Sequence, residues 1–358
     1  MCFELTSFNN PFIRVALVDD HKGVAEGFER FINESENARV VGKAKQSRIE
    51  WIDSAKGIGI LCVVFAHICA NGYIADFIYL FHMPLFFFIG GYLYKPTDDY
   101  KGYFVKKVKH LLIPYFVFLV ILQFGEMLTP SYNDKIYTHI YNSIYGGRLL
   151  SGWTGVFWFI TCFFLSQQIF SLIMRVKRPY IKYIMFALLL FAYINYLYMP
   201  DMLFPWSVNN ILYTVPIFYF GYIFRDMENR INKRLLLVTI LVVIVAVSLY
   251  FYPSMQIRIK ETLYGVPYIS FASGILIIVS VIMFSKYISQ YRWSSIIQYI
   301  GRAAIVIMYL HQFVQICVSQ AFTENIVVRF TLAVLIPLIT FYIFSKYKIM
   351  RRLFLGIS

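Results

Sequence analysis

Long runs of apolar residues recur through most of this chain, and short polar stretches separate them. Each run is close to the roughly 20 residues that a helix needs to cross a bilayer. The pattern therefore predicts an all-α integral membrane bundle of about ten transmembrane helices. Their expected ranges are 57–74, 77–94, 111–128, 153–173, 181–199, 207–224, 235–252, 263–284, 303–320 and 326–345.

Composition and charge agree with a membrane location. The chain is 59% hydrophobic and 15% charged, which excludes an ordinary soluble domain. Among its 33 Lys and Arg residues, only Lys135, Arg148, Arg258 and Lys260 fall in the predicted outside loops. This bias predicts that both termini are cytoplasmic and that the protein is multi-pass in the cell (inner or cytoplasmic) membrane. The net charge of +14 then reflects topology, with membrane lipid rather than nucleic acid as the partner.

The first 47 residues lack the long apolar runs of residues 48–358, the predicted membrane domain. Residues 12–18 have the pattern of a buried strand that ends at Asp19 and Asp20, an amphipathic helix is expected from Gly27, and 38–44 suit a second strand. This order resembles the opening β-α-β unit of response-regulator receiver domains, whose acidic pair helps to hold Mg²⁺. The later strand with the phospho-accepting aspartate is missing. We therefore expect a truncated receiver-like fragment in a cytoplasmic tail, without phosphorelay function.

Lys56 and His67 are the first residues in the apolar region that point to chemistry. They are eleven positions apart, so on a helix they lie within about 20° of one direction, with about 16 Å of rise between them. If the helix spans from near Lys56, His67 lies near the bilayer midplane, where an ionisable side chain is costly and marks a functional site by default. The alternative is a neutral histidine bonded to a neighbouring helix. Asp53, three residues before Lys56, suits a helix N-cap.

Five motifs occur in order along the chain: Asp53 to His67, Phe81 to Tyr92, Lys106 to Tyr115, Phe157–Trp158, and Ile300 to His311. Together they resemble the acyltransferase-3 family of multipass membrane enzymes over about residues 48–345, most closely its fucose 4-O-acetylase-like branch. Gly90 and Ala304 stand where this family usually has serine. These two departures leave open a catalytically inactive membrane scaffold.

The resemblance implies an O-acyltransferase that moves an acyl group, commonly acetyl, from acyl-CoA to a hydroxyl of a surface glycan or glycoside. It implies that His67 is the general base, and an imidazole with a pKa near 6.5 suits that role at neutral pH. Cations on the cytoplasmic side are expected to bind the phosphates of acetyl-CoA, or else to be interfacial anchors required by topology alone. They are Lys56, Lys106, Lys109 and Arg302, with Lys107 and His110 in the same basic run.

Further residues are expected on the acceptor side or along the reaction path, namely His82, His311, Glu126, Arg148 and Trp158. Glu126 is placed either to pair with Arg148 or to contact a sugar. The connection 129–152 carries apolar residues at helical spacing (Tyr137, Ile140, Tyr141, Ile144), which predicts a short helix in the outer interface. This connection is the candidate for acceptor recognition, or it merely caps the bundle.

A transporter of a polysaccharide, glycolipid or amphipathic solute is the alternative function. It also accounts for ionisable groups within the membrane and for interrupted helices. The two halves show no internal repeat, which disfavours it. The five cysteines have no paired metal spacing, and four fall within predicted spans, so neither disulfides nor a metal site is expected. The sequence leaves the acceptor, the acyl chain and the oligomeric state open.

Overall fold

The computed structural model describes residues 2–5, 13–18, 38–44, 49–69, 72–129, 136–228, 237, 240, 241, 244 and 254–357. The chain divides into two compact units, Met1–Glu50 and Trp51–Ser358. The described elements of the first unit are strands, and those of the second are chiefly helices.

The N-terminal unit contains a three-stranded sheet in the order β1-β2-β3. β2 (Ile13–Val18) and β3 (Ala38–Ala44) pair in parallel, with a bulge between Val15 and Ala16. Both strands were predicted, and both are confirmed. β1 (Cys2–Leu5), antiparallel to β2, was not predicted from the sequence. The helix expected from Gly27 lies outside the described residues.

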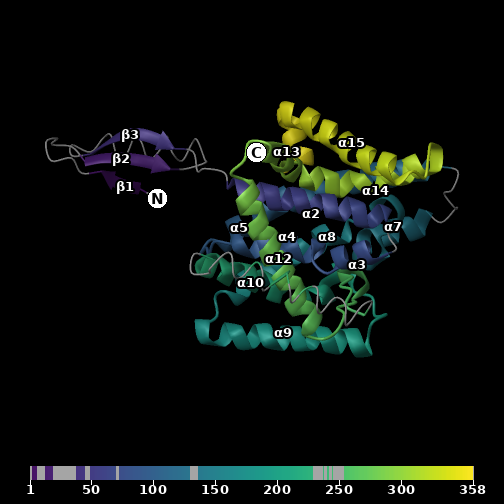
Figure 1. The fold of residues 1–358 in the computed structure, drawn as a ribbon, viewed down its shortest axis with the longest axis horizontal. Helices are drawn as coiled ribbons and strands as arrows, with labels where there is room; N and C mark the ends of the chain where they lie inside the picture. Colours follow the sequence, from purple (N-terminus) through teal and green to yellow (C-terminus); the bar gives the residue numbers. More distant parts are fainter. Residues whose placement is uncertain are drawn as a thin grey trace. The chain divides into compact units, whose positions relative to one another are not determined.

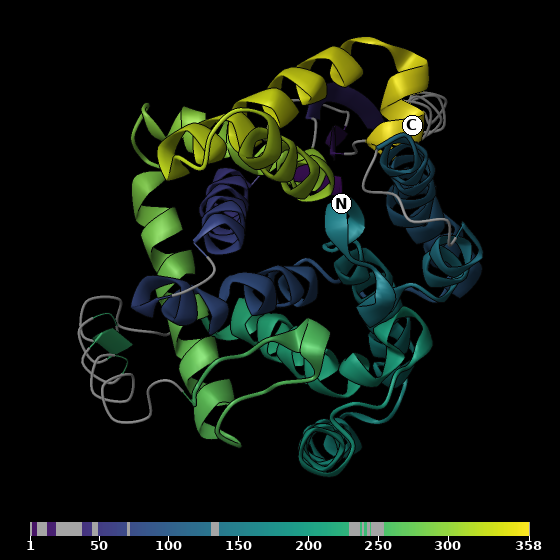
Figure 2. The ribbon, with the colours of Figure 1, turned by 90° about the vertical axis from the view of Figure 1, so that its right-hand side faces the viewer.

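The second unit is a helical bundle, which confirms the predicted fold class. Figure 1 shows α2 and α9 running in similar directions, and Figure 2 views them close to end-on. Its helices are α2 (Glu50–Ile68), α3 (Tyr73–Tyr79), α4 (His82–Tyr92), α5 (Tyr100–Lys107), α6 (Ile113–Met127), α7 (Ile136–Tyr145), α8 (Trp158–Ile173), α9 (Arg178–Tyr198), α10 (Ile211–Met227), α12 (Ile269–Ile288), α13 (Ser294–Arg302), α14 (Ala304–Ala321), α15 (Ile326–Lys346) and α16 (Lys348–Phe354). A π-helical turn, Val108–Leu112, joins α5 to α6.

Within the described residues, eight helical segments are long and apolar enough to cross a membrane. They are Glu50–Ile68, Tyr73–Tyr92, Tyr100–Met127, Gly152–Ile173, Arg178–Tyr198, Ile269–Ile288, Ala304–Ala321 and Ile326–Lys346. α10 has 17 residues, close to spanning length. The predicted span 235–252 lies almost entirely outside the described residues, so the count of ten stays a prediction.

The first membrane helix begins earlier than the sequence pattern predicted. α2 starts at Glu50 rather than near residue 57, because the polar residues of its first turns lie against the rest of the bundle. Asp53 is consequently a buried residue inside the helix, and its predicted N-cap role is wrong. His67 lies in the last turn of α2 and not halfway along that helix.

Two pairs of helices meet backbone to backbone at glycines. A Cβ atom on Gly91 of α4 would collide with the carbonyl oxygen of Phe218 in α10, and one on Gly221 of α10 would collide with that of Phe88. In the same way, a Cβ on Gly301 of α13 would meet the Asp53 carbonyl of α2. Small residues are what allow membrane helices to approach this closely.

Replacing these glycines by alanine is expected to destabilise the bundle. Gly91→Ala and Gly301→Ala should each cost about 1–3 kcal/mol, because the added methyl group can be accommodated only by moving a backbone. Thermal unfolding of the purified protein in detergent measures this loss. Gly125→Ala is the control, because its Cβ would meet only the ring of Trp153, at 3.1 Å. Equal melting temperatures for all three variants would contradict the close-packing argument.

Candidate active site

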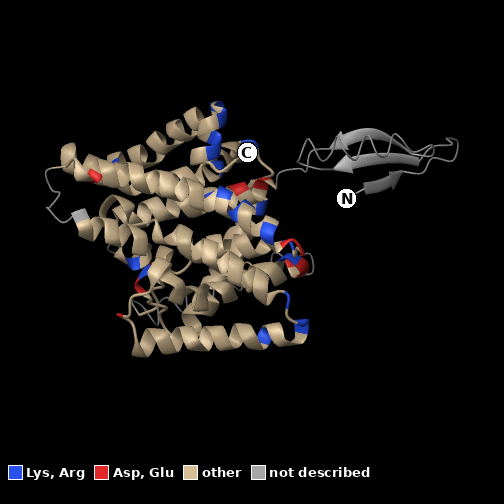
Figure 3. Cartoon of the chain, turned by 180° about the vertical axis from the view of Figure 1, so that it is seen from behind, with Lys and Arg blue, Asp and Glu red and all other residues tan. Residues whose placement is uncertain are grey.

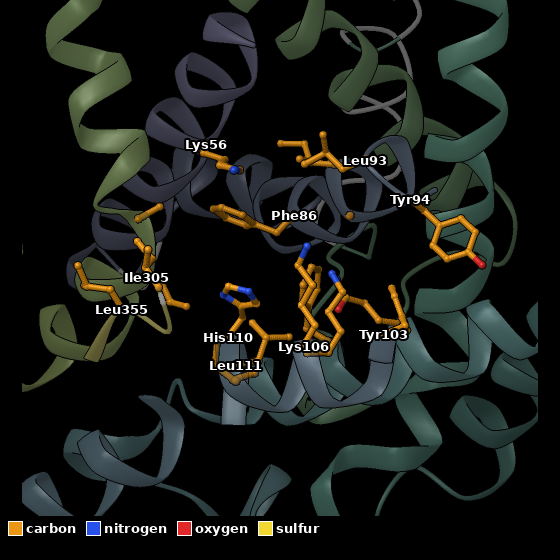
Figure 4. A pocket seen from close by; sticks show the side chains of 18 of the residues that line it. Lys56, Phe86, Leu93, Tyr94, Tyr103, Lys106, His110, Leu111, Ile305 and Leu355 are labelled. Atoms are coloured by element: carbon orange, nitrogen blue, oxygen red, sulfur yellow. The ribbon is translucent and has the colours of Figure 1, made fainter. Parts of the chain in front are cut away.

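Lys and Arg residues gather at one end of the bundle (Figure 3), and several of them line a pocket of about 830 Å³. Basic side chains from separate elements line it. They are Lys56 from α2, Lys95 from the segment after α4, Lys106 and Lys107 from α5, His110 from the π-helical turn and Arg302 from α13. Lys56 extends from one wall, and Lys106 and His110 extend toward it from the facing wall (Figure 4). An anion with several charges would find cations on both sides of this cavity.

Close helix packing explains how two of these cations come together. Gly57 and Gly301 let α2 and α13 touch, with Gly57 against the carbonyl of Ile297. Lys56 and Arg302 are the direct neighbours of these two glycines in the chain. The contact between the helices therefore brings both cations to one wall of the pocket.

The opposite wall depends on the irregular helix from α5 to α6. The Asp99 side chain accepts a hydrogen bond of 2.8 Å from the Gly102 backbone and so caps the start of α5. The π-helical turn that follows adds a residue to the helix, a feature often found at functional sites. His110 lies in this turn, where it bonds to the Gly356 backbone, and Leu355 and Ile357 complete this side of the lining.

The structure brings together three of the four cations predicted to bind the donor. Lys56, Lys106 and Arg302 line the pocket, and Lys109 does not. Lys109 is exposed instead and lies outside the lining of this cavity. Lys107 and His110, from the same basic run, line the pocket with Lys106. Tyr103, Lys106, Lys107 and His110 all line the pocket and follow at intervals of three and four residues, the spacing of one helical face, whereas Lys109 lies to one side of that face.

The inner part of the pocket is apolar. Its lining includes Phe86 of α4, Phe159, Ile160 and Phe163 of α8, and Ile305 and Met308 of α14. On α4, Phe86 lies one turn from His82, and on α14, Met308 lies one turn from His311. The helices α4 and α14, which form two walls of the pocket, thus continue to His82 and His311.

The histidines form a cluster inside the bundle. The rings of His67 and His311 lie with their centroids 5.3 Å apart and their planes at 45°. His82 and Lys260 also act electrostatically on His67. His311 is about halfway along its candidate span, as is His82. The cluster therefore lies at mid-height of these two helices, although His67 is in the last turn of its own.

The protonation of two rings follows from their hydrogen bonds. His311 Nδ1 lies 2.8 Å from the Ile307 carbonyl, and His82 Nδ1 lies 2.8 Å from that of Ile78. A carbonyl oxygen only accepts, so Nδ1 carries the proton in both rings and Nε2 of the neutral ring is an acceptor. His311 is fully buried, and its Nε2 has no hydrogen-bond partner among the described residues. Such an atom is costly to leave unpaired and is a place to look for a ligand.

The remaining predicted residues lie apart from the pocket lining or only beside it. The Arg148 guanidinium donates to the Pro200 carbonyl at 2.7 Å and pairs with Asp201 at 3.7 Å, so its predicted pairing with Glu126 is wrong. Glu126 lies against Gly152 and bonds to the Trp153 backbone. Trp158 is buried at the start of α8, directly before the pocket residue Phe159.

The short helix predicted in the connection 129–152 is confirmed as α7. Tyr137, Ile140, Tyr141 and Ile144 follow at helical spacing on α7, and all four are exposed. An exposed apolar face of this kind suits the membrane interface.

Lys260 was missed as a neighbour of the site. Its ammonium group donates a hydrogen bond of 2.7 Å to the Leu150 carbonyl and lies within electrostatic reach of His67. Burial lowers the pKa of Lys260, Arg148 lowers it further, and Glu261 opposes the shift. The one sequence signal was its position among the few cations of the outside loops.

Comparison with known proteins agrees with this arrangement. Residues 49–346 match the model of the acyltransferase-3 family, which is described as an acyltransferase domain. The chain belongs to the acyltransferase-3 family. The matched region contains the whole pocket lining except Leu355 and Ile357, together with all three histidines of the cluster. No curated protein and no solved structure matches the chain. The family and the apolar helices together identify a multi-pass membrane acyltransferase.

Proposed function

We propose that this acyltransferase-3 protein moves an acetyl group from acetyl-CoA to a hydroxyl of a surface glycan or glycoside. The observation that carries the proposal is the pocket, which has a basic outer part and an apolar inner part that ends one helical turn from His82 and His311. Acetyl-CoA has the matching sequence of groups: phosphates at one end, a thin arm, and the thioester at the other. The fucose 4-O-acetylase-like motifs make a sugar hydroxyl the proposed acceptor.

The proposed base is His67. Neither His67 nor His311 lines the pocket, but the His67 side chain keeps some solvent access whereas His311 is fully buried, and on this ground we assign the base to His67. One ring nitrogen of His67 accepts the proton of the acceptor hydroxyl as its oxygen attacks the thioester carbonyl. The carbon–oxygen bond forms, the carbon–sulfur bond breaks, and the proton passes to the departing sulfur to give CoA.

His311 has a positioning role in this proposal. Its Nε2 has no hydrogen-bond partner among the described residues, and the centroid of the His67 ring is 5.3 Å from that of His311, so we propose that a turn of the His67 ring brings an N–H of His67 to this nitrogen. A hydrogen bond of this kind fixes which nitrogen of His67 faces the hydroxyl, as second partners of catalytic histidines do. His82, held by Ile78, is proposed to border the acceptor.

The proposed orientation places the basic pocket at the cytoplasmic face, where acetyl-CoA is made, with both termini on that side of the cell membrane. The acceptor enters from the opposite end, which carries α7, Glu126 and Arg148. Supporting this orientation, Lys and Arg residues gather at the pocket end of the bundle in Figure 3. Donor and acceptor then meet at the histidine cluster from opposite sides.

His67→Gln is expected to lower acetyl transfer by about 10²–10⁴-fold, because no general base remains to accept the hydroxyl proton. Transfer of radiolabelled acetyl groups from acetyl-CoA by purified protein measures the effect. The control is His21→Gln, which lies in the N-terminal unit. If His67→Gln stays within a few-fold of wild type while equally well inserted, His67 is not the base.

His311→Phe is expected to lower kcat by about tenfold to hundredfold with little change in the KM for acetyl-CoA, because it removes only the acceptor that orients His67. His311→Gln keeps a hydrogen-bond acceptor and should recover part of this loss. A purely structural role predicts instead that both variants lose folded protein together. Such a result, seen by size-exclusion chromatography in detergent, argues against positioning.

Lys106 and Lys109, two lysines of the same basic run, allow a matched comparison of substitutions inside and outside the pocket. Lys106→Gln should raise the KM for acetyl-CoA several-fold, and the increase should shrink at high salt, where screening already weakens the attraction. Lys109→Gln removes the same charge three residues away, but outside the pocket, and should have little effect. Equal effects of the two variants would point to a diffuse surface charge and not to a phosphate site. Protein that binds no acetyl-CoA and moves a glycolipid across liposomes would replace the proposal with a transporter.

A further inference from the structure

Gln167 is a buried polar residue in the wall of the pocket. It lies on α8, is 6% exposed and lines the cavity. Its carboxamide oxygen has no hydrogen-bond partner among the described residues. Polar groups this deep in a protein are nearly always paired, so an unpaired one beside a cavity points to a ligand.

The position of Gln167 along the pocket indicates which part of a ligand it meets. Phe159, Phe163 and Gln167 follow one another at intervals of four residues and so share one face of α8. Phe159 contacts Phe86, which lies one turn from His82, and from Phe159 to Gln167 the helix rises about 12 Å. One turn beyond Gln167 on α8, Ser171 accepts a hydrogen bond from the pocket residue Tyr94, the chain neighbour of the basic residue Lys95. Gln167 is therefore a polar group between the basic outer part of the pocket and its apolar inner part.

A carboxamide has a distinctive complement. It offers N–H donors and a carbonyl acceptor side by side, which is the pattern that a second amide matches with two hydrogen bonds. A turn of the carboxamide by 180° exchanges the two ends, so Gln167 can present either a donor or an acceptor to the cavity. A phosphate would favour a cation here, and a plain acyl chain would favour another apolar residue.

We propose that the Gln167 carboxamide hydrogen-bonds to an amide of the pantetheine arm of the acyl-CoA donor. The inference rests on the proposed function and assigns a residue to the middle of the donor, between its phosphates and its thioester. Gln167 fixes the position of the arm along the pocket. The thioester then reaches the histidine cluster while the phosphates remain among Lys56, Lys106 and Arg302. It touches no reacting atom and acts on donor binding.

The neighbouring residue provides the control. Gln168 is as buried as Gln167, at 5% exposed, and both polar atoms of its carboxamide also lack partners among the described residues. Gln168 does not line the pocket. The substitutions Gln167→Leu and Gln168→Leu therefore remove the same group from the same helix, and only the first removes it from the proposed donor site.

The experiment measures binding of CoA and of adenosine 3′,5′-bisphosphate, which lacks the arm, to purified full-length protein by calorimetry. Gln167→Leu should weaken CoA binding about threefold to tenfold, the effect of losing one or two hydrogen bonds, and leave binding of the bisphosphate unchanged. The KM for acetyl-CoA should rise by the same factor, with kcat nearly unchanged. Gln168→Leu should alter none of these values.

Melting temperatures separate a binding role from a structural one. Without ligand, Gln167→Leu should melt at or above the wild-type temperature, because an unpaired buried polar group has been replaced by an apolar one. The upward shift that CoA produces in the wild type should be smaller in this variant. A variant that melts lower and binds the bisphosphate as poorly as CoA would overturn the inference. So would wild-type affinity for CoA in Gln167→Leu, and that result would leave the acyltransferase proposal intact. Failure of the wild-type protein itself to bind CoA would overturn both.

Discussion

Backbone contact at glycines is the constraint on which this bundle and its pocket depend. Gly57 and Gly301 join α2 to α13, and Gly91 and Gly221 join α4 to α10. Within a membrane the hydrophobic effect does little to drive helices together, so their association depends on close van der Waals packing. The contact between α2 and α13 brings Lys56 and Arg302 to one wall of the pocket. The contact between α4 and α10 fixes the position of α4, which forms another wall. The packing that stabilises the fold therefore also shapes the cavity.

Hydrogen bonding distinguishes the polar residues that hold the bundle together from those that are available for chemistry. Ser166 and Thr214 bond to each other, and Tyr264 bonds to Asn210. These pairs satisfy buried polar groups and need no further partner. His311 Nε2 and the Gln167 carboxamide oxygen are buried too, but neither has a partner among the described residues. Gln167 lines the pocket, and His311 lies one helical turn beyond the pocket residue Met308.

Several features of the site follow directly from local sequence rules. The repeated apolar runs were enough to predict the helical bundle, because a chain that crosses a bilayer has to satisfy its backbone hydrogen bonds within helices. The eleven-residue spacing of Lys56 and His67 was enough to place both on one face of a helix. The helical spacing from Tyr137 to Ile144 was enough to predict α7. Each of these conclusions needs only the geometry of a single segment.

Contacts between segments decided what the sequence could not. That His67 meets His311, more than 200 residues away, depends on how α2 and α14 pack. Which face of the helix from α5 to α6 turns toward the pocket, so that His110 lines it and Lys109 does not, depends on how this helix packs against the rest of the bundle. Arg148 pairs with Asp201 and not with Glu126 because the chain near Pro200 folds back against it. The sequence by itself determined the helices, the family and the residue types of the chemistry. Only the tertiary structure decided which side chains meet, because that depends on close packing between helices far apart in the chain.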